Sequence, residues 1–388
     1  MKINRKNIYL IFATFYIYFI MALFESSRGN FIPFFIEEFK TNNSTISMIL
    51  SLNTVGCVIG SFLGGSMCEK FGHKLVFICG TIIATAAVFM APLISNIYIL
   101  TLFYFIFGVG RSALSVSVDS LVPVLSVGFE VILMNITHFM YGFGSFAGQS
   151  ICGKLLYYGF SWRSIYAYLG IFFVLSIIFS FFMKIPNIHV IREKTDLSKS
   201  DLYKDPLIPL FVAAVSFYIL SESLVNTWFI NYIRSTYNFN PAEASVYASM
   251  FFLFFAAGRL LGGFIINKLG DVKGLKLFII IATLCVLLGL LLKKSGLILI
   301  SLSGFFISIG FPTFMVIISK SFNQNSSMAI GLITTLSNIM FVIMFYFVGV
   351  INDHASTYAA FFITPLSLAS CFIMLSLIST KIKEKENF

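Results

Sequence analysis

Long apolar runs follow one another along almost the whole chain and limit the folds that it can adopt. A helix needs about 20 mostly apolar residues to cross the hydrocarbon core of a bilayer. Twelve such runs lie at 8–34, 44–64, 75–94, 97–120, 129–152, 164–184, 207–231, 243–266, 275–292, 297–319, 328–350 and 357–380. Only 11% of the residues are charged, against about 25% in typical soluble proteins. The sequence therefore predicts an all-α membrane protein with twelve transmembrane helices.

One long polar stretch, "KIPNIHVIREKTDLSKSDLYKDP" at 184–206, separates the first six runs from the last six. The other connections are mostly short, so neighbouring helices are expected to be antiparallel. We therefore predict an N-terminal six-helix bundle at 1–184, a cytoplasmic linker at 185–206 and a C-terminal six-helix bundle at 207–388.

The basic residues predict how the chain is oriented. If the N-terminus lies inside, 17 of the 26 Lys and Arg residues fall on cytoplasmic segments and 6 on outer segments. An excess of Lys and Arg is typical of cytoplasmic loops. We therefore expect a multi-pass protein of the cell (cytoplasmic) membrane, surrounded by the lipid bilayer, with both termini cytoplasmic. The net charge of +10 is then a topology signal, and no nucleic-acid partner is expected.

The two halves share a glycine-rich loop. The stretch "GSMCEKFGHK" follows the second run, and "GFIINKLGDVK" follows the eighth. Aligning Gly65 with Gly263 gives an offset of 198 residues, 263 minus 65. The same offset pairs Gly60 with Gly258, Gly64 with Gly262, Lys70 with Lys268 and Gly72 with Gly270. Many alternating-access transporters are built from such repeated halves.

This loop resembles the G-x-x-x-D-R-x-G-R-K motif of the major facilitator superfamily, and the resemblance extends over the whole chain. The matching residues are Gly65, Glu69, Lys70, Gly72, His73 and Lys74. The resemblance implies two pseudo-symmetric six-helix bundles around a central cavity. It also implies a cytoplasmic gate in which acidic and basic side chains pair at the helix ends. We assign Glu69, Lys70, Gly72, Lys74, Arg259 and Lys268 to this gate.

A narrower resemblance is to the fucose/glucose permease type of sugar–proton symporter. That group carries a membrane glutamate, a tryptophan six residues later, and Gly-Arg late in the eighth span, which match Glu222, Trp228 and Gly258–Arg259. In the fourth span, Ser115 stands where the group places an acid, and Asp119 stands where it places an asparagine. Arg111 is an additional cation, so the usual proton site of the group is absent or moved.

Charged side chains inside the predicted spans are the candidate functional residues, because each costs at least about 2.5–3.5 kcal/mol to insert. We predict that Glu25 and Glu222 take part in proton coupling, because both lie away from the cytoplasmic end of their spans. Glu222 also lies one residue from the repeat equivalent of Glu25. The predicted substrate-binding residues are Arg28, Arg111, Asp119, His138, Asn226 and Trp228. Catalytic and metal-binding residues are not expected.

Each assignment has a structural alternative. Glu25 and Arg28, at positions i and i+3, can neutralise each other as a local pair. Asp119 fits a hydrated gate near the inner surface, His138 fits a hydrogen bond between helices, and Trp228 fits a lipid belt. Arg111 and Asp119 are eight residues apart, so each needs a partner elsewhere, and Glu25 or Glu222 is the expected partner of Arg111.

The leading functional hypothesis is a secondary transporter that moves a small polar, sugar-like solute by alternating access with a proton as coupling ion. Arg28 and Arg111 favour an organic anion or amino acid as the alternative, and drug or metabolite efflux is a third reading. An enzyme is not expected, because the sequence has no P-loop and its six cysteines show no metal-binding spacing. We expect a monomer without a cofactor.

Overall fold

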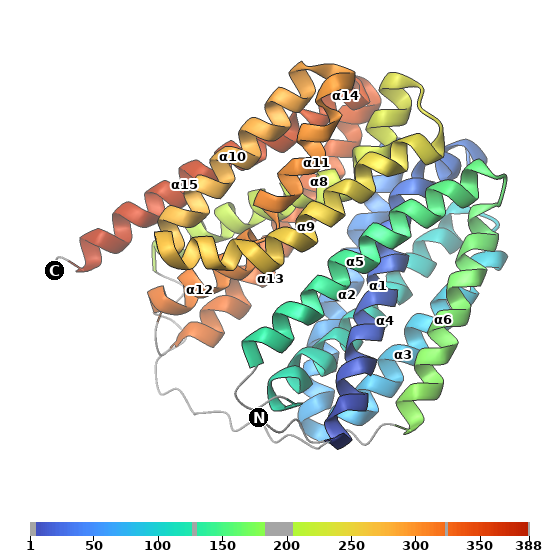
Figure 1. Cartoon of the computed structure of the whole chain (residues 1–388), viewed down its shortest axis with the longest axis horizontal. Coiled ribbons are helices and arrows are strands. Elements are labelled where there is room, and N and C mark those ends of the chain that lie inside the picture. Colours follow the sequence, from blue (N-terminus) through green and yellow to red (C-terminus); the bar gives the residue numbers. More distant parts are fainter. Residues whose placement is uncertain (1–4, 126–129, 183–204, 323–324, 387–388) are drawn as a thin grey trace. The chain divides into compact units, whose positions relative to one another are not determined.

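The computed structural model describes residues 5–125, 130–182, 205–322 and 325–386, and within these ranges the chain is helical apart from short turns (Figure 1). Contacts divide the chain into two compact units, Met1–Ile191 with Phe239–Ser249, and Arg192–Asn238 with Met250–Phe388. Nearly all of the predicted linker, 185–206, lies outside the described residues, so its role and the predicted domain boundaries remain predictions.

The first unit contains the helices that match the first six apolar runs. They are α1 (Arg5–Glu38), α2 (Asn43–Phe71), α3 (His73–Phe89) with the 3₁₀ turn η1 (Ala91–Leu93), α4 (Ile97–Leu125), α5 (Glu130–Tyr157) and α6 (Trp162–Phe182). Helix α1 is continuous although it contains Pro33. A proline can bend a helix, but Pro33 does not divide α1 into two helices.

The helices from 207 onward match the last six runs. They are α8 (Leu207–Tyr237), α9 (Pro241–Leu269), α10 (Asp271–Leu291) with η2 (Lys293–Gly296), α11 (Leu297–Ile307), α12 (Gly310–Phe322), α13 (Ser326–His354), α14 (Thr357–Phe361) and α15 (Ile363–Glu386). The predicted run at 297–319 is divided into α11 and α12 by a turn at 308–309. Pro312 has no N–H to donate to the carbonyl of Ser308, which explains why the helix is interrupted there.

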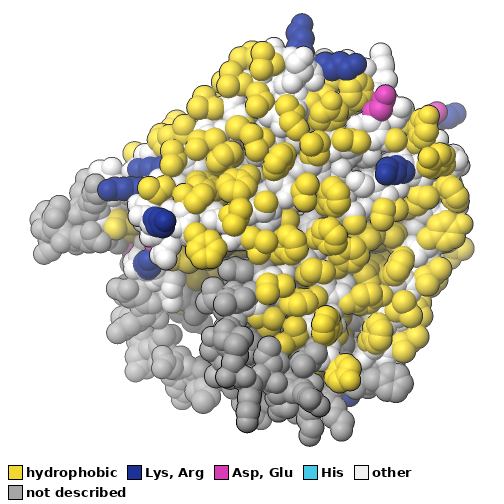
Figure 2. All heavy atoms as spheres, in the orientation of Figure 1, with side chains coloured by type: hydrophobic (Ala, Val, Ile, Leu, Met, Phe, Trp, Pro, Cys, Tyr) yellow, Lys and Arg dark blue, Asp and Glu magenta, His cyan; other side chains and the backbone are white. Residues whose placement is uncertain are grey.

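These helices confirm the predicted all-α membrane architecture. Within the described residues, eleven helical stretches are long and apolar enough to cross a bilayer, and α5 occupies the remaining predicted run, 129–152. Figure 2 shows a face on which hydrophobic side chains predominate and charged ones are sparse. Such a surface suits lipid, because hydrocarbon cannot solvate exposed charges.

Glycines set the spacing between α2 and α4. Gly56, Gly60 and Gly64 repeat every four residues on α2 and face the backbone of α4 at Phe105, Val109 and Ala113. A Cβ at Gly56 would lie 2.5 Å from the carbonyl oxygen of Phe105. Small residues allow such close approach between membrane helices.

The sequence repeat is also a structural repeat. In the second half, Gly258, the equivalent of Gly60, faces the carbonyl of Phe305 on α11. The aligned loop glycines share one conformation, because Gly72 has φ of 84° between α2 and α3 and Gly270 has φ of 83° between α9 and α10. Side chains other than glycine rarely adopt this region, so both loops need a glycine at this position.

A polar cluster joins the C-terminal end of α1 to the N-terminal end of α6. The Arg163 guanidinium lies 2.6 Å from Glu38 Oε1, and Trp162 Nε1 donates to Glu38 Oε2 at 2.8 Å. Arg163 also donates to the carbonyl of Ile94, directly after η1. This cluster fixes the end of α1 that follows the charged residues of the candidate site.

We predict that Gly60→Ala lowers the thermal unfolding midpoint of the purified protein. The new Cβ would overlap the Val109 carbonyl oxygen and force α2 away from α4. Gly65→Ala is the matched control, since a Cβ there meets nothing within 4 Å and alanine favours a helix by roughly 0.5–1 kcal/mol. Equal midpoints for the two variants would contradict this account of the α2–α4 contact.

Candidate functional site

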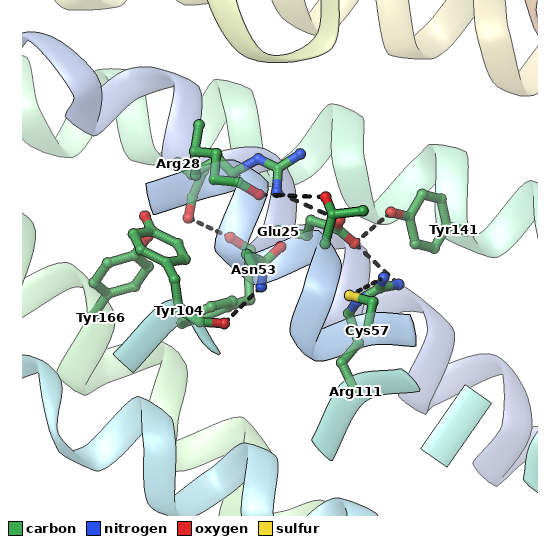
Figure 3. Close-up of polar contacts among 12 residues, drawn as sticks. Glu25, Arg28, Asn53, Cys57, Tyr104, Arg111, Tyr141 and Tyr166 are labelled. Atoms are coloured by element: carbon green, nitrogen blue, oxygen red, sulfur yellow. Dashed lines mark hydrogen bonds and ion pairs between the residues drawn. The ribbon is translucent and has the colours of Figure 1, made fainter. Parts of the chain in front are cut away.

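Glu25 lies at the centre of a charged cluster formed by α1, α4 and α5. Its Oε1 is 3.6 Å from Arg28 Nη1, and its Oε2 is 3.4 Å from Arg111 Nη1 (Figure 3). The Tyr141 hydroxyl donates to the same Oε2 at 2.7 Å. One carboxylate therefore receives two guanidiniums and a phenol, and it connects three helices.

Close packing between α1 and α5 positions this cluster. Gly144 and Gly148 of α5 face the backbone of Phe19 and Leu23 of α1, and a Cβ at Gly148 would lie 2.5 Å from Ser26 Oγ. Because the helices approach so closely, the side chain of Tyr141 can reach Glu25. The glycines of the fifth span therefore act in helix packing, as their spacing suggests.

The cluster is largely buried and has an excess of positive charge. The side chains of Glu25 and Arg28 are each 13% exposed, and that of Arg111 is 21% exposed. Arg111 Nη2 also donates to Cys57 Sγ at 3.1 Å. Within the described part of the chain, the buried Nε atoms of Arg28 and Arg111 have no hydrogen-bond acceptor. The two guanidiniums therefore retain donor capacity that the protein leaves unused.

The structure confirms two predicted contacts: the local pair of Glu25 with Arg28, and the pairing of Arg111 with Glu25. Sequence reasoning missed Tyr141 and Cys57. Tyr141 follows His138 by three residues and so shares its helix face, a signal that could have been used. Cys57 carried no such signal, because cysteines in apolar runs are usually buried structural residues.

A second polar pair lies further along the same helices. The Tyr18 hydroxyl donates to Asp119 Oδ1. The Tyr18 ring meets the His138 ring edge-on, with centroids 5.9 Å apart, and the Tyr141 ring at 6.3 Å. Tyr18 precedes Glu25 by seven residues, about 10 Å along α1. The predicted residues Asp119 and His138 are thus gathered around Tyr18, which was not predicted.

On α8, the predicted residues Glu222, Asn226 and Trp228 belong to one unbroken helix. In such a helix Trp228 points about 120° away from Glu222. Trp228 is only 1% exposed, and its ring centroid lies 6.5 Å from that of Phe345. A residue of a lipid belt would be exposed at the surface, so this role does not fit Trp228. Among the described residues, Trp228 Nε1 and Asn226 Oδ1 are buried without a hydrogen-bond partner.

The predicted gate residues lie at or near the glycine loops, except Arg259, which lies within α9, eleven residues before Gly270. Glu69 and Lys70 end α2, Lys74 begins α3, and Lys268 is in the last turn of α9. The Arg259 guanidinium lies over the Phe255 ring, 5.1 Å from its centroid. Asp271, beside Gly270, pairs with Lys320 at 2.5 Å, a contact that sequence reasoning did not predict. The gate role of these residues remains a prediction.

The sequence profile described as Major Facilitator Superfamily matches residues 14–292 and 210–388, which together span most of the chain. The chain belongs to the Major Facilitator Superfamily. It is therefore a multi-pass membrane transporter, as the glycine loop and the repeat indicated. No curated protein sequence matches it significantly.

Solved structures of other transporters share this fold. The fucose:proton symporter of E. coli is 19% identical, with a TM-score of 0.66 over 96% of this chain and 99% of that one. The nucleoside transporter NupG is 14% identical, with a TM-score of 0.74 over 96% and 100%. A bacterial homologue of the human lysosomal transporter Spinster is 12% identical, with a TM-score of 0.74 over 99% and 97%. The resemblance to fucose permeases is supported, although identities this low establish the fold alone.

The described residues contain no group of three or more His, Cys, Asp or Glu side chains placed to hold a metal ion. The side chains of the charged cluster in the first unit can form hydrogen bonds and ion pairs and can exchange protons. Carboxylate and phenol oxygens accept hydrogen bonds, and guanidinium and phenol groups donate them.

We predict that Glu25→Gln destabilises the transporter more than Tyr141→Phe. Removing the carboxylate leaves two buried guanidiniums without a counter-ion, which costs about 3–5 kcal/mol. Removing the phenol hydroxyl loses one charge-assisted hydrogen bond, about 1.5–3 kcal/mol. Thermal unfolding of the purified variants measures the difference. The reverse order would show that Glu25 does not hold the cluster together.

Proposed function

We propose that this protein is a proton-coupled secondary transporter that moves a small polar, sugar-like solute by alternating access. The observation that carries the proposal is the buried cluster of Glu25, Arg28, Arg111 and Tyr141, which combines charged hydrogen-bond donors and acceptors inside a mostly apolar bundle. Hydroxyl-rich solutes need both kinds of partner. The cost of inserting these charges favours a functional role.

Two solved relatives support this class of solute, because one is a fucose:proton symporter and another is a nucleoside transporter. Fucose and nucleosides both carry several hydroxyl groups. The distribution of Lys and Arg supports a cytoplasmic-membrane location with both termini inside. We further propose that the transporter works as a monomer.

An organic anion or amino acid is the second candidate solute. The observation that favours it is the charge of the cluster, in which two guanidiniums share one carboxylate and neither Nε atom has an acceptor among the described residues. Guanidinium groups bind carboxylates through paired hydrogen bonds. A carboxylate on the solute could use the donors that the protein leaves free.

Uptake into proteoliposomes with an imposed pH gradient tests both candidates. The panel contains labelled monosaccharides, nucleosides, carboxylates and amino acids, with protein-free liposomes as the control. We expect uptake of a monosaccharide that depends on the pH gradient and is abolished by a protonophore. Gradient-driven uptake of a carboxylate without any monosaccharide uptake would replace the first candidate with the second.

Arg28→Ala separates a binding role from a local structural pair. If Arg28 contacts the solute, uptake should fall about tenfold or more, because a charged hydrogen bond contributes about 1.5–3 kcal/mol, while the unfolding midpoint stays near that of the unmodified protein. A local pair predicts a lower midpoint with uptake retained by the folded fraction. Arg28→Lys keeps the charge without the planar fork, and it shows whether charge alone suffices.

A further inference from the structure

The two acidic side chains inside the first unit have partners of different kinds. Glu25 is in contact with two guanidiniums and a phenol. Asp119 accepts a hydrogen bond from the Tyr18 hydroxyl, and no ion pair joins it to any lysine or arginine that the structure describes. Tyr18 is buried, with 5% of its surface exposed.

These partners differ in what they can do when a proton arrives. A guanidinium only donates hydrogen bonds, so it is matched to a carboxylate and not to the O–H of a carboxylic acid. A phenol both donates and accepts. The hydrogen bond between Tyr18 and Asp119 can therefore persist in both protonation states, with its direction reversed when Asp119 carries the proton.

The charge balance of the cluster also distinguishes Glu25 from Asp119 as a site for the proton. A proton on Glu25 would leave the guanidiniums of Arg28 and Arg111 without their shared counter-ion, and a buried charge without a partner is strongly destabilising. A proton on Asp119 removes a negative charge from a buried site. Among the described residues it breaks no ion pair and weakens only the longer-range attraction to Arg111, two turns away on α4. Glu25 is thus suited to be a permanent charge, and Asp119 to be a transient one.

We propose that Asp119, held by Tyr18, is the carboxylate that takes up and releases the coupling proton, in place of Glu25. The step is the addition of one proton to the Asp119 carboxylate on one side of the membrane and its loss on the other, with no other bond changed. The proposal rests on the proposed proton-coupled transport and names the residue that performs its proton step.

Among the residues that the structure describes, few other titratable groups surround Asp119. Tyr18 contacts it from α1, and Arg111 lies two turns away on α4 itself. From α5, His138 and Tyr141 pack against the Tyr18 ring. Cysteines of α2 and the backbone of α3 contact α4 at Arg111 and Ser117. Cys57 of α2 contacts Arg111. Cys68 of α2 and the His73 carbonyl of α3 contact Ser117.

Infrared difference spectroscopy of the transporter in lipid tests the proposal without any solute. The spectrum is recorded between the two pH values used on opposite sides of the membrane in the uptake assay. We expect a carbonyl band from a protonated carboxyl that is lost in Asp119→Asn and shifted in frequency in Asp119→Glu. A band unchanged in both variants, or absent from the unmodified protein, would overturn the proposal.

Two further variants identify the role of the neighbours. Tyr18→Phe keeps the ring but removes the hydroxyl, so the pH midpoint of the band should move, and an unchanged midpoint would remove Tyr18 from the proposal. His138→Gln should leave the band in place, and loss of the band would show that Asp119 does not take up the proton independently of His138, against the proposal. Because no solute is used, these outcomes are independent of whether the transported solute is a sugar or an anion.

Discussion

The pairing of one carboxylate with two guanidiniums inside an apolar bundle is the constraint on which the rest of the first unit depends. Glu25 must stay with Arg28 and Arg111, because each of these charges would be very costly alone in a hydrocarbon environment. The pairing joins α1 to α4, and Tyr141 extends it to α5. The same contacts therefore hold these three helices together and define the chemistry of the site.

Close helix packing makes this pairing possible. Gly60 brings α2 against α4, and Gly144 and Gly148 bring α5 against α1. These contacts place Cys57 and Tyr141 within hydrogen-bond distance of side chains on neighbouring helices. The second unit repeats the glycine contacts and the loop conformation of Gly270, but its α8 carries a buried tryptophan at 228. The repeat thus preserves the scaffold while the interior chemistry differs.

The proposed proton coupling requires a carboxylate whose charge can change, and the two buried carboxylates of the first unit have partners of different kinds. Guanidiniums hold Glu25 as an anion, whereas the phenol of Tyr18 can pair with either form of Asp119. Sequence reasoning assigned the proton to Glu25 and Glu222 because both lie in the spans away from the cytoplasmic end. The number and kind of the partners of Glu25, which favour a different assignment, depend on contacts between helices.

Sequence alone was sufficient for the membrane class, the twelve spans, the repeat and the superfamily, since hydropathy, glycine spacing and motif residues are read along the chain. It also predicted the pair of Glu25 and Arg28, which share one helix face. It did not identify Tyr141, Cys57 or Tyr18 as partners, nor the turn at 308–309. Contacts between helices depend on how each helix is rotated about its axis, and packing over residues far apart in sequence sets that rotation. The tertiary structure therefore decided that Glu25 is paired with two guanidiniums and that Asp119 accepts a hydrogen bond from a neutral phenol.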